Sequence, residues 1–257
     1  HWRDLQLEES EIGIFPILWF GDIDAWLASD HKILTVGINP GPSTFTPVNS
    51  GKNWWHGCLG PNDYFRPKRQ VFGSPNLQSY KEMMARYTKK IAQRTRDKQW
   101  FDSYSPILHA IPHAVTVTQQ GYLHLDIFSP IATAQKWSNL EINNQPLQHQ
   151  LQSYGLKLFK QLLKILEPNG IILSIRKDQW RLVQQELCVH KEQTIWRKAT
   201  NSNNYATYSL AQTQKWNHSS YDKNFWVCFD RKTNFTPFQD SDGSAIGKAL
   251  CDFIQAK

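Results

Sequence analysis

The sequence predicts an α/β fold, with one domain built on a central parallel sheet that has helices on both faces. Short apolar runs rich in β-branched residues alternate with longer segments whose apolar residues recur at helical spacing. The chain has 257 residues, of which 40% are hydrophobic, enough for one full core. We expect a single α/β domain over 1–257, with its core at about 33–254 and a long aromatic loop at 43–75.

Four apolar runs are typical of buried strands, because they are uncharged or nearly so and end at turn-forming residues. The first, Ile33–Ile38, is followed by Asn-Pro-Gly-Pro, and proline cannot continue a strand ladder. The other predicted strands are Tyr122–Phe128, Ile171–Ile175 and Phe225–Phe229.

Helices are predicted between these strands from the three-and-four spacing of apolar residues. The clearest predicted helix ends at Pro168-Asn169-Gly170. The most basic predicted helix carries six Lys and Arg residues, which either follow phosphates or are simply solvated. A packed N-terminal segment, Ile14–Leu27, is expected to contain a short helix. The predicted helices are Leu77–Arg96, Leu147–Glu167, Asp178–Leu187 and Ser244–Ile254.

The composition of the chain limits the classes of function that it could have. The formal net charge is +7, which favours polyanionic partners, nucleic acid before membrane, although a protein can also be basic without such a partner. Eleven Trp residues either stack on unpaired bases or fill the core. The four cysteines form no CxxC pair, which argues against a zinc or iron–sulfur site. No membrane-length apolar run or signal segment occurs, so we expect an intracellular, cytoplasmic protein.

The turn after the first strand carries the most specific pattern, Gly37-Ile38-Asn39-Pro40-Gly41. Together with the later block at 121–139, GYLHLDIFSPIATAQKWSN, it resembles the uracil-DNA glycosylase superfamily, in its mismatch-specific and single-strand-selective branches. The order of later strands and helices is similar as well. The likeness is residue-specific over about thirty positions.

The resemblance implies roles for the residues of this turn. Asn39 would orient the attacking water, and the backbone of Gly37 and Ile38 would bind the departing base. The residues that follow would contact DNA, and these are Pro40, Gly41 and Ser43. The alternative for Asn39 is an ordinary turn residue that bonds its own backbone.

Asp126 lies near the end of the second predicted strand, where related enzymes read the edge of the base. A carboxylate only accepts hydrogen bonds and suits the amino group of cytosine, so we expect a cytosine-type base, plausibly a modified one. A helix-cap or ion-pair role is equally open. Phe45, Trp54 and Tyr64 are candidates to stack on the flipped base.

The second motif of the family, a short His/Asn/Met-Pro-Ser loop, is not reproduced. The best positional match is Asn234-Phe235-Thr236-Pro237-Phe238, in which Asn234 and Thr236 would contact DNA. Phe238 would wedge into the duplex or pack in the core, and Lys232 would hold a phosphate or be solvated.

The expected function is that of a monofunctional DNA glycosylase acting on a uracil-like or modified, possibly bulky, cytosine-derived base, leaving an abasic site. No cofactor or metal is expected, and DNA is the expected partner of a monomer. Base excision in repair is the default role, with defence against foreign DNA as the other. The alternatives are a non-catalytic DNA-binding protein that retains the fold and an α/β hydrolase acting on nucleosides.

Overall fold

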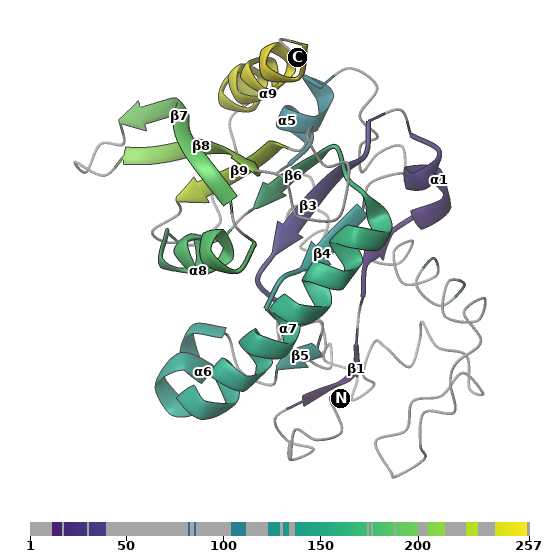
Figure 1. Ribbon diagram of the computed structural model, residues 1–257, viewed down its shortest axis with the longest axis vertical. Helices are drawn as coiled ribbons and strands as arrows, with labels where there is room; N and C mark the ends of the chain where they lie inside the picture. The colour runs from purple at the N-terminus through teal and green to yellow at the C-terminus, as the bar shows by residue number, and fades with distance from the viewer. Residues whose placement is uncertain are drawn as a thin grey trace, which may run out of the picture.

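A computed structural model of the chain describes residues 12–16, 18–29, 31–39, 82, 85, 104–111, 123–128, 131–133, 137–173, 175, 177–187, 189–199, 205–213, 225–230 and 240–255. Strands and helices alternate along most of it (Figure 1). In chain order the elements are β1 (Ile12–Pro16), β2 (Phe20–Gly21), α1 (Ile23–Leu27), β3 (Ile33–Gly37), α5 (Ser105–His109), β4 (Leu123–Asp126), β5 (Ile131–Thr133), α6 (Trp137–Asn143), α7 (Gln145–Leu166), β6 (Gly170–Leu173), α8 (Lys177–Leu187), β7 (Val189–Ala199), β8 (Tyr205–Thr213), β9 (Phe225–Asp230) and α9 (Asp240–Gln255).

The main sheet has seven strands in the order β2-β4-β3-β6-β9-β8-β7. The four strands predicted from the sequence form its centre and are parallel to one another. The prediction of a parallel sheet is wrong at the margins, where β2 runs antiparallel to β4, β8 to β9 and β7 to β8. The broader prediction of an α/β fold is confirmed.

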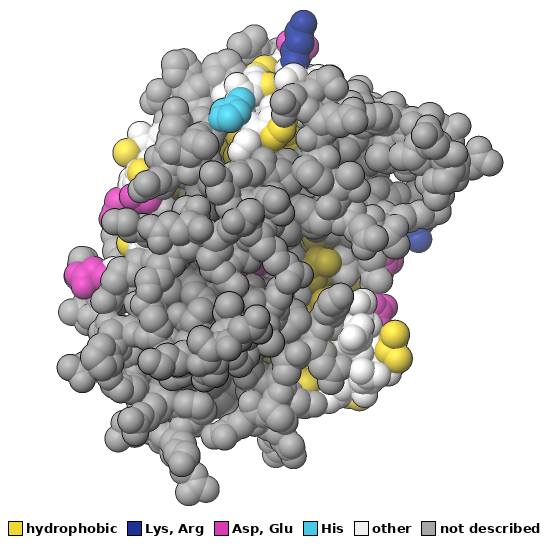
Figure 2. All heavy atoms as spheres, turned by 180° about the vertical axis from the view of Figure 1, so that it is seen from behind, with side chains coloured by type: hydrophobic (Ala, Val, Ile, Leu, Met, Phe, Trp, Pro, Cys, Tyr) yellow, Lys and Arg dark blue, Asp and Glu magenta, His cyan; other side chains and the backbone are white. Residues whose placement is uncertain are grey.

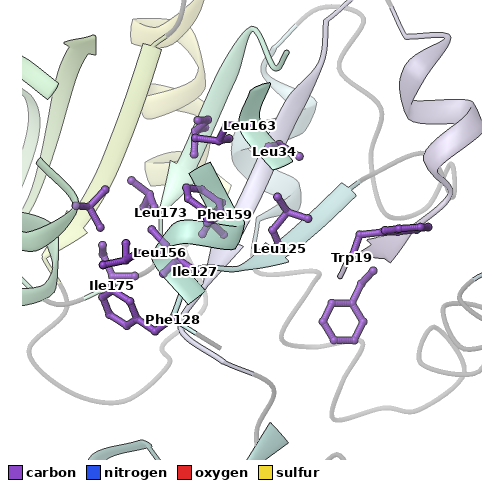
Figure 3. Packing of buried hydrophobic residues seen from close by; sticks show 14 of the residues in the cluster. Trp19, Leu34, Leu125, Ile127, Phe128, Leu156, Phe159, Leu163, Leu173 and Ile175 are labelled. Carbon is purple, nitrogen blue, oxygen red and sulfur yellow. The ribbon is translucent and has the colours of Figure 1, made fainter. Parts of the chain in front are cut away.

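The helices lie on both sides of the sheet. Residues Leu34 and Val36 of β3 face α7 and α8, as do their counterparts in β4 and β6, and all belong to one buried apolar cluster. Leu156, Phe159 and Leu163 of α7 point toward these strands (Figure 3). This cluster is the main core among the described residues.

The opposite face of the sheet is covered differently. There α5 packs on α9, and the two lie together in Figure 1. Tyr104, which precedes α5, lies against β4. A Cβ atom at Gly247 of α9 would lie 2.6 Å from the Ile107 carbonyl oxygen, so glycine permits this close approach.

Helix α7 has defined ends. The Asn144 side chain accepts a hydrogen bond from the Leu147 N–H at 3.2 Å and caps its first turn. Glu167 ends the helix in the left-handed conformation, with φ 49° and ψ 58°. The next residues join the sheet, because the Asn169 side chain accepts from the Lys32 N–H at 2.9 Å and its own N–H donates to the Lys32 carbonyl at 2.8 Å.

Four of the tryptophans belong to the interior. These are Trp19, Trp26, Trp137 and Trp180, and each of them is buried. Trp137 stacks on Phe128 with ring centroids 5.9 Å apart, and the Trp26 indole donates to the Ile33 carbonyl at 3.0 Å. These four rings therefore pack in the core and are not surface platforms for bases.

The described surface has no single dominant feature. On the face in Figure 2, the hydrophobic and acidic side chains of described residues reach the surface at separate places. Of the helix predicted over 77–96, Glu82 and Ala85 are described, and both are helical and exposed. Within the described residues, no helix combines the length and apolar character needed to cross a membrane.

Candidate functional site at the carboxyl ends of the central strands

The turn after β3 and the end of β4 lie at the same edge of the sheet. These strands are parallel, and Gly37 is the register partner of Asp126. Asn39 follows two residues after Gly37, so it belongs to this edge as the sequence predicts. The structure thus brings together the two side chains on which the sequence hypothesis depends, Asn39 and Asp126, within one stretch of the sheet edge.

Hydrogen bonds fix the backbone of this turn. The Ile127 N–H donates to the Gly37 carbonyl and the Phe128 N–H donates to the Ile38 carbonyl, both at 3.0 Å. Gly37 is buried, whereas Ile38 and Asn39 are partly exposed. The pairing between β3 and β4 therefore continues past both strand ends, and it carries Asn39 out to the surface on a braced turn.

The strand order marks this edge as a binding position. From β3 the chain goes to β4 on one side, then returns across the sheet to β6 on the other side of β3. In open α/β sheets, such a change of direction leaves a crevice at the carboxyl ends of the strands, where ligands bind. The Gly37–Asn39 turn leaves β3 at this position.

Inside the sheet, two buried polar side chains lie in a row with Asp126. Thr35 and His124 are register partners on β3 and β4, and they are 2% and 1% exposed. The Thr35 hydroxyl Oγ1 lies 2.9 Å from His124 Nδ1. The other ring nitrogen, Nε2, lies 3.6 Å from Asp126 Oδ1. The imidazole is thus held between a hydroxyl and a carboxyl group.

Two aromatic rings lie near the imidazole. The ring centroids of Phe20 and Tyr104 lie 5.7 and 6.2 Å from that of His124. All these groups occupy the sheet face covered by α5 and α9, because Leu123 and Leu125 point to the opposite face. These polar side chains are therefore surrounded by apolar and aromatic groups, where electrostatic effects are strong.

The carboxyl group of Asp126 is almost enclosed, with 4% of its side chain exposed. Burial raises the pKa of Asp126 above its ordinary value of 3.8, and the nearby His124 offsets part of this effect. The separation from His124 is too long for a good hydrogen bond, so we describe it as an electrostatic contact. The sequence left a helix-cap role and an ion-pair role open for Asp126. Of these two, the contact with His124 favours the ion pair.

His124 is the site residue that the sequence analysis missed. Its one sequence signal is the spacing His124-x-Asp126 within a strand, which puts both side chains on one face. The third member, Thr35, is 89 residues away along the chain and is brought in only by the pairing of β3 with β4.

The remaining predicted site residues lie outside the described residues, as does the whole predicted loop 43–75. They are Pro40, Gly41, Ser43, Phe45, Trp54, Tyr64, Lys232, Asn234, Thr236 and Phe238. Within the described part, no three His, Cys, Asp or Glu side chains gather in a way that could hold a metal ion.

Comparison with known proteins adds no relative. No family model, no curated protein and no solved structure matches the chain.

Proposed function

We propose that the protein is a monofunctional DNA glycosylase that hydrolyses the N-glycosidic bond of a flipped-out uracil-like or modified pyrimidine. The observation that carries the proposal is the position of the Gly37-Ile38-Asn39 turn, which leaves the central strand at the crevice position of the sheet. The sequence of this turn is the one that resembles the glycosylase superfamily. A net charge of +7 suits a polyanionic substrate.

The reaction needs a positioned water and a stabilised leaving base, because the sugar becomes cationic as the base departs. Asn39, partly exposed on its braced turn, would orient the water through its side-chain amide. Its amide cannot take up the proton of that water as a carboxylate would. Catalysis would therefore depend on positioning and on stabilising the base, and Asp126, at the end of β4, is our candidate for contacting the base.

The direct test measures base release, read as alkali-dependent strand cleavage. The DNA panel carries uracil, thymine mismatches, and cytosine with methyl, hydroxymethyl or glycosylated hydroxymethyl groups. Asn39→Ala should lower release on the order of 100-fold or more. Asn169→Ala is the matched control, because it removes a structural hydrogen bond at the opposite ends of β3 and β6 and should leave the rate unchanged.

Two results would contradict the proposal. Release of no base from any DNA, with DNA still bound, would indicate a non-catalytic binding protein. Cleavage of free nucleosides without cleavage of DNA would indicate a small-molecule hydrolase.

A further inference from the structure

The contacts of His124 hold its ring beside the Asp126 carboxyl group. A ring held at Nδ1 by Thr35 cannot turn without breaking a buried 2.9 Å contact, so Nε2 stays directed at the carboxyl group. Burial raises the pKa of the Asp126 carboxyl group and so favours its protonated form in this nearly enclosed site. Loss of that proton would leave a net negative charge in a nearly enclosed site, which is costly.

We propose that the His124–Asp126 pair donates a proton to a cytosine-type base as it leaves, with Asp126 as the catalytic residue and His124 as the positioning residue. This inference rests on the proposed glycosylase function and deepens it. A protonated carboxyl offers one O–H donor beside one acceptor oxygen. The N3 and amino group of cytosine offer an acceptor beside a donor, so the two edges match. Uracil carries hydrogen on N3 and cannot accept a proton there.

The step balances in protons and electrons. The bond from C1′ of the sugar to N1 of the base breaks, and its electron pair stays with the base. The Asp126 proton adds to N3, so the base leaves neutral. Water adds to C1′, and the proton that it loses restores the one missing from the His124–Asp126 pair. No oxidant, reductant or metal takes part.

The side chains described around the His124–Asp126 pair determine which other groups could contribute to the pH dependence of base release. Thr35 of β3 and Phe20 of β2 carry no charge in the accessible pH range. Tyr104, which precedes α5, is the other titratable side chain described against the imidazole. A Tyr104→Phe variant therefore tests whether the phenol contributes to any pH dependence.

The experiment measures single-turnover base release from pH 5 to 9 on the cytosine-type DNA identified in the panel. Wild type should slow about tenfold for each pH unit above the point at which the pair loses its proton. Asp126→Asn should abolish this dependence and lower the rate on the order of 100-fold or more. His124→Gln should move the midpoint of the profile while leaving DNA affinity unchanged, and Tyr104→Phe should leave the profile as it is in wild type.

Further variants keep the inference testable if His124→Gln does not fold. Thr35→Val removes the Nδ1 partner, together with the 3.4 Å hydrogen bond that the hydroxyl donates to the Leu123 carbonyl. It should move the midpoint in the same direction as His124→Gln. Asn169→Ala controls for loss of stability and should not move it. Release that is independent of pH in wild type, or a midpoint unmoved in Thr35→Val and His124→Gln, would overturn the proton donor and leave the glycosylase intact. Release of uracil but of no cytosine-type base would do the same, whereas no release of any base overturns both.

Discussion

At the scale of single residues, His124 and Asp126 decide what the sheet edge can do. An imidazole in a sheet interior is usually a satisfied core residue, and His124 has two such contacts. One of them is a carboxyl group that burial disfavours in its charged form. The protonation of this carboxyl group can be measured whatever reaction the protein catalyses.

Replacing Asp126 with Asn should change how stability depends on pH. Burial raises the pKa of Asp126, so the folded protein holds this proton more tightly than the unfolded chain does. Its stabilising effect is complete below the unfolded pKa and is lost as pH rises toward the folded pKa. Wild type should therefore lose stability relative to Asp126→Asn from about pH 4 upward, by about 1.4 kcal/mol for each unit of pKa elevation. Urea denaturation at several pH values would measure this, and parallel curves would contradict it.

Gly155 is the residue at which helix α7 and the site meet. A Cβ atom there would overlap the carbonyl group of Phe128, which follows β4 and whose N–H holds the Ile38 carbonyl. Gly155→Ala should therefore lower the free energy of unfolding by about 1–3 kcal/mol despite the better helix propensity of alanine. Ser153→Ala, on the exposed side of the same helix, is the control and should be stable. Thermal unfolding of both variants would suffice, and an unchanged midpoint for Gly155→Ala would show that this packing is wrong.

At the scale of elements, the four central strands and the helices α7, α8 and α9 could be predicted, because their apolar periodicity is strong and local. The antiparallel hairpin of β7 and β8 could not. Its first strand reads VHKEQTIWRKA, which lacks an apolar run and alternates poorly. It is held by pairing with β8, which pairs in turn with β9. Pairing partners of this kind are not visible in a local pattern.

The end of α7 offers a prediction at this scale. Glu167 adopts a left-handed conformation that is unfavourable for any residue with a Cβ atom. Glu167→Gly should therefore stabilise the protein, by about 0.5–1 kcal/mol after the greater flexibility of glycine in the unfolded chain is deducted. Glu141→Gly within α6 makes the same exchange at ordinary helical geometry and should destabilise. Denaturant titration that found both variants destabilised would contradict the assigned helix end.

At the scale of the whole molecule, the net charge of +7 should contribute more to DNA affinity than recognition of the DNA base sequence does. Affinity for an unmodified duplex should fall steeply with salt, by about 40-fold between 50 and 200 mM if three phosphates are neutralised. Fluorescence anisotropy with labelled DNA would give the slope. Affinity that is independent of salt would exclude a phosphate-dominated interface and with it the proposed substrate.

The site could be predicted from the sequence only in part, for a reason that belongs to this scale. Asn39 follows one predicted strand and Asp126 lies near the end of another. Parallel strands end at one edge, so the shared position of the two residues follows from local patterns. The contact of His124 with Thr35 depends on which strands are neighbours and in what register. That information lies in the packing of the whole sheet.

The central position of β3 has a consequence for the nascent chain before it folds. Both neighbours of this strand follow it in the sequence, and Gly170, the partner of Ile33, is 137 residues downstream. At ribosomal speeds of about 5–20 residues per second, that separation corresponds to roughly 7 to 27 seconds of synthesis. During that time the strand Ile33–Gly37, buried along its whole length in the final fold, has nothing to pair with on the β6 side. The nascent chain thus exposes an apolar segment before the strands that pair with it are made. The yield of folded protein in a cell should therefore depend on chaperones that bind this segment.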